Sequence, residues 1–581
     1  MKIIDTSKAK CKNCYRCVRH CPVKAIKIKD GQAEVVEERC ILCGICLLQC
    51  PQNAKKIRND LDRVKKLVSS NEKVVASIAP SYPVSFDVES PEQMFRILRN
   101  LGFDAVEETA VGAEIVSKQL TKLRQDEYQK PIITTACPVV KNLIEKYHPK
   151  LLNLMPPVVS PMIAHGRLIK KRYGQSTKVV FIGPCVAKKA EAEDTSVKGD
   201  IDAVLTFEEL KNWINEKGVS IQDKTESSSD TLFPNHARTY PLPGGLLKTS
   251  RIKNDILLKD ILVVDGIKNC LDVLNSLEKG EIQTGFIEIL ACNGGCIAGP
   301  VIGSHDSVYK RRQRLLEFIE KNKKNYSNKN ITDGLEIDLS RSFEPKVFKA
   351  EKPGHKTVKQ ILKSIGKMTP EQELNCGACG YSSCREKAEA VYQGMAELDM
   401  CIPYMRSKAE SLANIIIDST PNGIILVDNK LNVQEINKSA EKLFKIKKGE
   451  VKNKPLRTII DDTDFASVLK THIPIFGKKV SYPMYSLTTT QTICYIKEHD
   501  LILGIIIDIT KQEQQEKEFQ KVREETLEKA QEVINKQMRV AQEIAGLLGE
   551  TTAESKMLLL KLMNLVKKGE NQNDSLHRSS L

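Results

Sequence analysis

Short apolar runs alternate with amphipathic segments over about residues 60–350, a pattern typical of α/β architecture. Thr206 and Glu209 have the spacing of a capping box and predict a helix that begins just after an apolar run. Because ligands in such folds bind beyond the carboxyl ends of strands, we expect the chemistry of this region to lie there. The predicted strands are residues 74–78, 132–135, 179–182, 203–205, 262–264 and 286–290.

The region after residue 408 carries a different pattern. Residues 422–428 and 431–436 predict two paired strands joined by a turn at Asn429 and Lys430. A helix is expected to begin near Asn437, and the segment LGIIIDIT (503–510) predicts a last strand.

A long charged helix is predicted next, with apolar residues at every seventh position. The repeat predicts a coiled-coil seam of about three heptads in a parallel dimer, and a helix that lies on its own domain is the alternative. Gly549 ends the repeat, Thr551 and Glu554 predict the cap of a second helix through 558–566, and a disordered tail follows. The repeating residues are Leu527, Ile534, Ala541 and Leu548, with Ala530 and Ile544 between them.

Composition limits the class of protein. At about 100–200 residues per domain, the 581 residues predict three to five domains. No run reaches the ~18–20 apolar residues of a membrane span, and MKIIDTSKAK does not read as a secretion signal, so we expect a cytoplasmic protein away from membranes. The net charge of +15 is scattered along the chain, which favours a solvated surface over nucleic-acid binding.

The chain has 18 cysteines, and their clustered spacing indicates metal rather than disulfides. The pattern CxxCxxCxxxCP occurs twice near the N-terminus and is typical of two [4Fe–4S] clusters, in which the fourth cysteine of each run binds the other cluster. Zinc is the alternative, but zinc favours paired CxxC motifs with longer spacers, often with histidine. The predicted ligand sets are Cys11, Cys14, Cys17 and Cys50 for one cluster, and Cys21, Cys40, Cys43 and Cys46 for the other.

Further cysteines stand at the ends of predicted strands in the central region. Cys137 follows PIITT, Cys185 follows VVFIG, and Cys292 follows FIEIL, with Cys296 four residues on. One buried cysteine is usually just a small apolar residue. Three strand ends, however, could deliver four thiolates to one crevice, which is enough for a third cluster.

Three segments of this region resemble the signature segments of [FeFe]-hydrogenases. They are TTACP (134–138), PCVAKKAE (184–191) and EILACNGGCIAG (288–299), and the resemblance covers roughly residues 1–310, including PGGLL (243–247). It implies an H-cluster, a [4Fe–4S] cube joined to a two-iron centre that carries carbonyl, cyanide and dithiolate ligands. By motif position, Cys137, Cys185, Cys292 and Cys296 would bind the cube, and Cys296 would bridge to the two-iron centre.

The resemblance also implies a role for Lys188, which matches a family lysine that donates to a cyanide ligand. The alternative is a surface lysine beside Lys189. Glu191 matches a family glutamate, which would hold that lysine or be exposed.

The chain departs from the productive hydrogenase pattern at several positions. Ala136 stands where the family has its first proton-relay cysteine, and a methyl group cannot carry a proton. Gly183 and Leu290 replace two methionines of the two-iron pocket, and we expect the glycine to open space there. A family relay serine aligns with Pro156. The metal scaffold is thus kept while proton delivery is impaired, which predicts low hydrogenase activity.

A fourth cysteine group precedes the last two regions. The group has the spacing CxxCx4C plus a distant cysteine after a helix-like segment, and Gly377 and Gly380 let its loop fold tightly. It resembles the small iron–sulfur module of corrinoid iron–sulfur proteins and sensory hydrogenases and predicts a further [4Fe–4S] cluster, with zinc as the alternative. The cysteines are Cys376, Cys379, Cys384 and Cys401.

The region after this group resembles a PAS domain, without a flavin-adduct cysteine motif or a haem histidine. We expect Cys494 and Cys270 to be packed residues rather than ligands.

We therefore predict a multidomain α/β and α+β protein that senses hydrogen or redox state with slow turnover. Hydrogen would be its ligand, a soluble electron carrier its redox partner, and a homodimer would signal to an enzyme in trans. The alternatives are a catalytic ferredoxin-linked hydrogenase and a non-catalytic electron-transfer scaffold. The predicted domains are a ferredoxin-like unit (1–58), an H-cluster domain (59–352), a four-cysteine module (353–407), a PAS domain (408–511), a coiled coil with a terminal helix (512–568) and a disordered tail (569–581).

Overall fold

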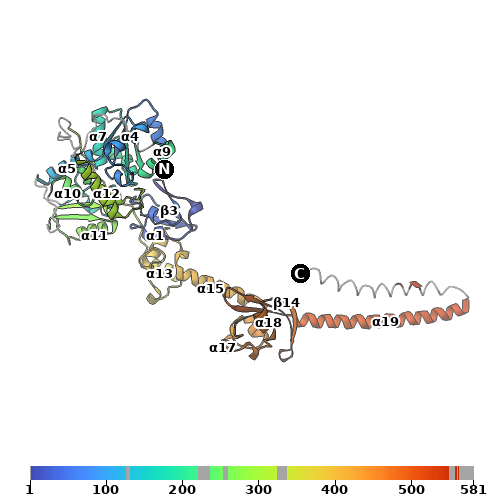
Figure 1. Ribbon diagram of the computed structural model, residues 1–581. Helices are drawn as coiled ribbons and strands as arrows, with labels where there is room; N and C mark the ends of the chain where they lie inside the picture. The colour runs from blue at the N-terminus through green and yellow to red at the C-terminus, as the bar shows by residue number, and fades with distance from the viewer. Residues whose placement is uncertain are drawn as a thin grey trace. The chain divides into compact units, whose positions relative to one another are not determined.

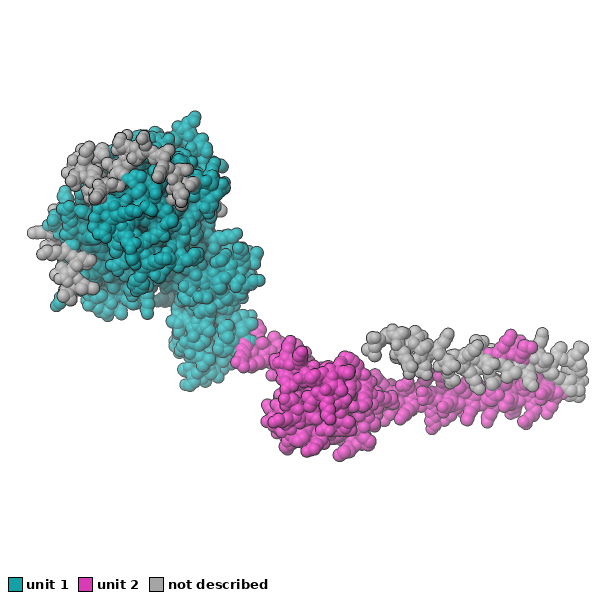
Figure 2. Space-filling model, viewed as in Figure 1, with its two compact units in different colours: residues 1–405 teal, residues 406–581 magenta. Residues whose placement is uncertain are grey.

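We analysed a computed structural model of the chain, which describes residues 2–125, 131–219, 234, 236–252, 259–323, 336–548, 557–558 and 561. The chain divides into two compact units, Met1–Met405 and Arg406–Leu581, which Figure 2 draws in different colours. All the cysteines except Cys494 belong to the first unit. None of the described helices is both long and apolar enough to cross a membrane.

Residues 2–58 form two small antiparallel strand pairs around the cysteine loops. Tyr15 and Gly44 adopt left-handed backbone conformations in these loops, and each precedes a short helix. The sequence analysis missed the strands because runs of three or four residues carry too little alternation to be recognised. The elements are β1 (Ile4–Thr6) paired with β4 (Lys55–Ile57), β2 (Ile26–Lys29) paired with β3 (Gln32–Val35), and the helices α1 (Arg16–His20) and α2 (Ile45–Leu48).

Two parallel sheets form the centre of the first unit, with the strand orders β6-β5-β8-β9 and β10-β11-β7. All six strands predicted in this region are present, with ends that differ by at most two residues. The unpredicted strand β6 contains two acidic residues, Glu107 and Glu108, which concealed its burial. The strands are β5 (Val74–Ile78), β6 (Ala105–Glu108), β7 (Ile132–Ile133), β8 (Lys178–Gly183), β9 (Ala203–Thr206), β10 (Ile261–Asp265) and β11 (Phe286–Leu290).

Helices surround these sheets (Figure 1). The predicted capping box is present, because Thr206 and Glu209 exchange side chain–backbone hydrogen bonds at the start of a helix. The helices are α3 (Leu61–Val68), α4 (Pro91–Asn100), α5 (Ala110–Gln125), α6 (Pro138–Tyr147), α7 (Pro161–Tyr173), α8 (Ala187–Glu193), α9 (Phe207–Lys217), α10 (Gly245–Thr249), α11 (Ile267–Glu278) and α12 (Val308–Lys321).

Helices α5 and α7 approach each other closely at Gly112. A Cβ atom there would lie 2.3 Å from the Pro161 carbonyl oxygen and 2.7 Å from the Cβ of His165. The close approach allows α7 to place His165 against strands β5 and β6.

The fourth cysteine group folds around α13 (His355–Ser364) and α14 (Cys384–Tyr392). The predicted helix after Cys384 ends at Tyr392, and a short 3₁₀ helix, η9 (Leu398–Met400), leads to Cys401.

The second unit contains a five-stranded antiparallel sheet with the order β13-β12-β16-β15-β14. The predicted strands correspond to β12, β13 and β16, and Asn437 caps the predicted helix. The sequence analysis missed β14 and β15, whose many lysines and threonines hide their alternation. The elements are β12 (Gly423–Asp428), β13 (Val433–Ile436), β14 (Ile475–Tyr482), β15 (Leu487–Ile496), β16 (Leu501–Asp508), α16 (Lys438–Leu443), α17 (Lys448–Val451) and α18 (Thr463–Thr471).

Two longer helices flank this sheet in the chain, α15 (Ile402–Ser419) and α19 (Thr510–Leu548). The described side chains of α19 are all exposed or half-buried, whereas a helix that lies on its own domain would bury an apolar face. Pairing of two chains through α19 stays a prediction. Gly549, most of the predicted helix at 558–566 and the tail at 569–581 lie outside the described residues.

Candidate metal centre

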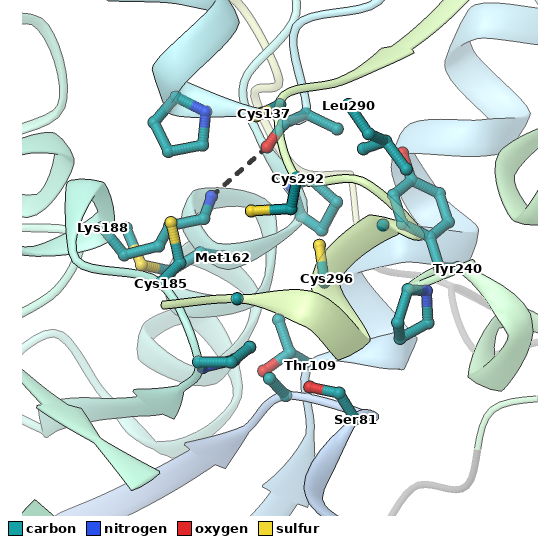
Figure 3. A pocket seen from close by; sticks show the side chains of 18 of the residues that line it. Ser81, Thr109, Cys137, Met162, Cys185, Lys188, Tyr240, Leu290, Cys292 and Cys296 are labelled. Atoms are coloured by element: carbon teal, nitrogen blue, oxygen red, sulfur yellow. Dashed lines mark hydrogen bonds between the residues drawn. The ribbon is translucent and has the colours of Figure 1, made fainter. Parts of the chain in front are cut away.

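Four cysteines from the ends of three strands line one cavity of about 100 Å³ (Figure 3). Cys137 follows β7 and precedes α6, Cys185 follows β8, and Cys292 follows β11. Cys296 lies in the 3₁₀ helix η6 (Gly295–Ala298). The structure therefore brings together the four thiols that the sequence placed at strand ends.

The thiols share a dry environment. Burial, together with the neighbouring thiols, raises the pKa of Cys185 to about 11, that of Cys296 to about 12 and that of Cys292 well above its usual value. Such thiols stay protonated at neutral pH until a metal takes the place of the proton. Among the described residues, no group of three or more His, Cys, Asp or Glu side chains is close enough to bind a single metal ion. The four thiols instead line a cavity, and an all-sulfur donor set suits an iron–sulfur cluster.

Backbone contacts hold the loop that carries Cys296. The Cys296 N–H donates to the Pro241 carbonyl at 2.8 Å, and a Cβ atom on Gly295 would lie 2.2 Å from that same oxygen. The Glu288 carboxylate accepts hydrogen bonds from the Gly244 and Leu247 N–H groups at 2.9 and 3.1 Å. The contacts of Glu288 fix the PGGLL segment against β11, and burial raises the pKa of Glu288 to about 7.

Lys188 and Ala136 form one end of the cavity, which we call the lysine end. Lys188 is only 8% exposed, and its Nζ donates to Glu191 Oε2 at 2.6 Å and to Ser160 Oγ at 3.0 Å. Its neighbour Lys189 is buried as well and pairs with Glu209. The alternative of a surface lysine is therefore wrong.

The partner of Lys188 belongs to a larger network of ion pairs. Glu191 Oε1 accepts from Arg341 at 2.8 Å, and Arg341 also pairs with Asp194. Burial would raise the pKa of Glu191, but Lys188 and Arg341 hold it below its usual value. Arg341 lies 150 residues from Glu191 in the chain, so no sequence pattern indicates this contact.

The departures from the hydrogenase pattern have clear structural outcomes. Ala136 and Leu290 line the cavity. Gly183 does not open space, because the Phe181 ring, which lines the cavity, lies 2.7 Å from where a Cβ on residue 183 would be. Pro156 is not among the lining residues, and the hydroxyl that reaches Lys188 belongs to Ser160.

The other end of the cavity carries hydroxyl groups, and we call it the hydroxyl end. Ser81 and Thr109 follow the neighbouring strands β5 and β6, and Figure 3 shows them on the same side of the cavity. Ser81 Oγ is buried and has no hydrogen-bond partner among the described residues. Sequence reasoning missed both residues, although the same rule of strand ends that located the cysteines applies to them.

The N-terminal cysteines gather as their spacing predicts. Burial raises the pKa of Cys40 to about 11, that of Cys46 to about 12 and that of Cys43 well above its usual value, and Cys21 contributes to each shift. Burial likewise raises the pKa of Cys17, and the neighbouring Cys11 and Cys14 contribute to that shift. Cys50 Sγ accepts a hydrogen bond from the Ala54 N–H at 3.2 Å. Cys21, Cys40, Cys43 and Cys46 therefore lie close together, as do Cys11, Cys14 and Cys17, while Cys50 as the fourth ligand of the latter set stays a prediction.

The last cysteine group also encloses a small cavity, of about 20 Å³, lined by Cys376, Cys379, Cys384 and Cys401. The module packs against the N-terminal domain, since Lys24 Nζ donates to the Gly380 carbonyl at 2.6 Å. Cys270 and Cys494 line none of the cavities described here. Cys270 is buried, with its Sγ 3.4 Å from the Leu290 carbonyl, and Cys494 is half-buried on β15.

Comparison with known families supports this arrangement. Residues 72–300 match the C-terminal domain of the iron-only hydrogenase large subunit, and residues 2–68 match a 4Fe-4S dicluster domain. Residues 372–403 match an Fe-S cluster family, and residues 414–485 match the PAS fold. The chain thus combines segments that match the C-terminal domain of the iron-only hydrogenase large subunit, a 4Fe-4S dicluster domain and the PAS fold.

Individual relatives cover only part of this hydrogenase-like chain. Iron hydrogenase 1 of Clostridium pasteurianum is 28% identical over 51% of this chain and 64% of that protein. Cytosolic Fe-S cluster assembly factor NAR1 of Yarrowia lipolytica is 24% identical over 42% of this chain and 66% of that protein. The chain thus spans slightly less than two thirds of each of these two relatives. A solved variant of [FeFe]-hydrogenase HydA1 from Chlamydomonas reinhardtii is 18% identical, with a TM-score of 0.38, over 50% of this chain and 100% of that one.

Proposed function

We propose that the protein is a hydrogen sensor whose hydrogenase-like site binds and splits hydrogen slowly and passes the change to a partner. Ala136 carries this proposal, because it lines the cavity at the position of the usual proton-relay cysteine. A positioned proton carrier contributes about 10²–10⁴-fold to a rate, so its replacement by a methyl group predicts slow turnover.

The residues present fit an H-cluster. Four thiols face one cavity, and the buried oxygens Ser81 Oγ and Tyr240 Oη, both from lining residues, have no hydrogen-bond partner among the described residues. Cys137, Cys185, Cys292 and Cys296 would hold the cube, and the last would also hold the two-iron centre. When bound, this group supplies the iron that binds hydrogen. The charge of Lys188, oriented by Glu191 and Ser160, would hold an anionic ligand of that group.

The packing of the cysteine groups supports an electron path through two N-terminal [4Fe–4S] clusters and one further cluster at 376–401. Cys43 belongs to the same core as Cys137 and Cys185, which supports a second cluster beside the cavity. Cys379 packs in the same core as Cys17 and Cys21. Electrons released at the cavity would pass along this series to a soluble carrier or to the four-cysteine module.

The second unit would pass the signal on. The PAS match and the long exposed helix α19 fit a homodimer that presents its state to a signalling enzyme in trans. We place this activity in the cytoplasm.

A second candidate function is an iron–sulfur scaffold that carries no two-iron centre, favoured by the relatives named as Fe-S cluster assembly factors. A catalytic ferredoxin-linked hydrogenase is the third candidate, and Ala136 argues against it. Infrared spectra of the matured protein under hydrogen and under argon separate these functions. We expect carbonyl and cyanide bands that shift under hydrogen. Absence of these bands after maturation would establish the scaffold instead, and bands indifferent to hydrogen would exclude sensing.

A further inference from the structure

A chain of hydrogen bonds leads away from the hydroxyl end of the cavity. Thr109 Oγ1 lies 2.7 Å from Ser77 Oγ, which lies 2.7 Å from His165 Nδ1. His165 Nε2 lies 3.2 Å from Glu107 Oε2. The chain crosses from the end of β6, through β5, to helix α7 and back to β6.

The outer end of this chain approaches the surface. Glu107 Oε1 accepts from Tyr173 Oη at 2.9 Å and from Arg172 Nη1 at 2.5 Å. The side chains of His165 and Glu107 are 0% exposed, whereas that of Arg172 is 25% exposed and Tyr173 is half-buried. Burial would raise the pKa of Glu107, but His165 and Arg172 hold it below its usual value, so Glu107 rests as an acceptor.

We propose that Thr109, Ser77, His165 and Glu107 conduct protons between the cavity and solvent, in place of the side chain that Ala136 lacks. This inference rests on the proposed function and adds the route by which the site exchanges protons. At the lysine end of the cavity, Lys188 already donates hydrogen bonds to Glu191 and Ser160. The hydroxyl end instead offers neutral groups that can each accept and donate a proton.

The transfer balances atom by atom. A proton from the cavity binds Thr109 Oγ1, whose own proton passes to Ser77 Oγ, and the Ser77 proton passes to His165 Nδ1. His165 Nε2 then gives its proton to Glu107, and Glu107 passes it to Tyr173 Oη as the Tyr173 hydroxyl gives its own proton to water. Splitting one hydrogen molecule yields two protons for this route and two electrons for the iron–sulfur clusters. Before the next transfer each hydroxyl must rotate back, and the His165 ring must again carry its proton at Nε2.

A purely structural role would not need this arrangement. The pair of Glu107 with Arg172 alone would anchor α7 to β6. Ser77 adds to that anchor through His165, but the Thr109 hydroxyl extends the network to a residue lining the cavity, which an anchor does not require. This extension is what favours conduction.

Matched substitutions separate conduction from structure. His165→Gln keeps an acceptor for Ser77 and a donor for Glu107 but cannot carry a proton. Thr109→Val removes one hydroxyl at nearly constant shape, and Thr109→Ser restores it. Thr121→Val serves as the control. It removes a hydroxyl on α5 that donates to the Ser117 carbonyl at 2.9 Å.

The main readout is the rate at which hydrogen shifts the carbonyl and cyanide bands of the matured full-length protein. We expect His165→Gln and Thr109→Val to slow this shift about 10²-fold, with Thr109→Ser and Thr121→Val near the wild-type rate. A second readout is the hydrogen-induced infrared signal of a protonated carboxyl group, which we expect to vanish in Glu107→Gln. Thermal unfolding of each variant shows whether the fold is intact.

The outcomes distinguish the relay from the sensing proposal. If the carbonyl and cyanide bands of the wild-type protein do not shift under hydrogen, the sensing proposal is contradicted, and the relay proposal falls with it. Wild-type bands that respond, with unchanged rates in folded His165→Gln and Thr109→Val, overturn the relay alone. If His165→Gln does not fold, the comparison of Thr109→Val with Thr109→Ser decides, and equal rates in those two variants contradict the relay.

Discussion

The two ends of the cavity are built from different chemistry. At the lysine end, Lys188 pairs with Glu191, and Glu191 in turn pairs with Arg341 in a buried network. Ala136 presents only a methyl group to the cavity at this end. At the hydroxyl end, Ser81 and Thr109 present neutral groups, and Thr109 leads to His165 through Ser77. A charge fixed by ion pairs suits the binding of an anionic ligand, whereas neutral hydroxyls suit the movement of a proton.

The largest expected effect comes from breaking the ion pairs behind the lysine end. Glu191→Ala leaves Lys188 and Arg341 without their shared buried partner, and we expect a loss of about 3–5 kcal/mol in the free energy of unfolding. Urea unfolding followed by the fluorescence of Trp213, which is the single tryptophan and is buried in the same unit, measures this loss.

Glu216 offers a matched control for that experiment. Its carboxylate lies 2.6 Å from Lys65 Nζ, the same separation as Glu191 from Lys188, but its side chain is 58% exposed against 1% for Glu191. We expect Glu216→Ala to change the unfolding free energy by no more than about 0.5 kcal/mol. Equal losses in the two variants would contradict the contrast between buried and exposed pairs.

Restoring a proton carrier at the lysine end is the next strongest test. Ala136→Cys places a thiol at the cavity wall, and we expect hydrogen evolution per matured centre to rise at least about 10²-fold. Gas evolution with a chemically reduced electron carrier measures it, and Ala136→Ser, whose hydroxyl is a much weaker acid, should gain less. A rate in Ala136→Cys no higher than wild type would show that proton delivery at this end is not limiting.

Removing the charge at the lysine end has a smaller expected effect. Lys188→Met keeps an apolar stem of similar length, and Glu191 keeps Arg341 as its partner. We expect retention of the two-iron centre to fall about 10–100-fold, measured as carbonyl and cyanide band intensity relative to total iron. Lys310→Met, at a pair whose lysine is 69% exposed, is the control and should retain full intensity.

The smallest expected effect concerns the placement of α7 behind the hydroxyl end. Gly112→Ala would bring a Cβ atom to 2.3 Å from the Pro161 carbonyl oxygen, and we expect a loss of about 1–3 kcal/mol in unfolding free energy together with a slower hydrogen-induced band shift. Gly449→Ala, at a site in α17 with open space around it, should change neither quantity. A normal band shift in a measurably destabilised Gly112→Ala would show that the position of His165 does not govern proton exchange.

The sequence predicted those parts of the site that are encoded locally. Cysteine spacing located the thiols that gather around the cavity, and apolar runs located the strands that deliver them. Glu107, Ser77 and His165 escaped notice because each is an ordinary polar residue in sequence, and only the sheet and α7 bring them together. Arg341 escaped for the same reason. The Phe181 ring fills the space expected at Gly183 because the packing of a side chain two residues away cannot be read from one position.

The central claim is that the metal scaffold is kept while fast proton delivery is lost at Ala136. The rate of hydrogen evolution by wild-type protein, normalised to centres that show hydrogen-responsive carbonyl and cyanide bands, tests it most directly. We expect evolution to stay at least about 10²-fold below that of Ala136→Cys, although these centres respond to hydrogen. Wild-type evolution that equals the rate of Ala136→Cys, in centres that respond to hydrogen, would contradict it.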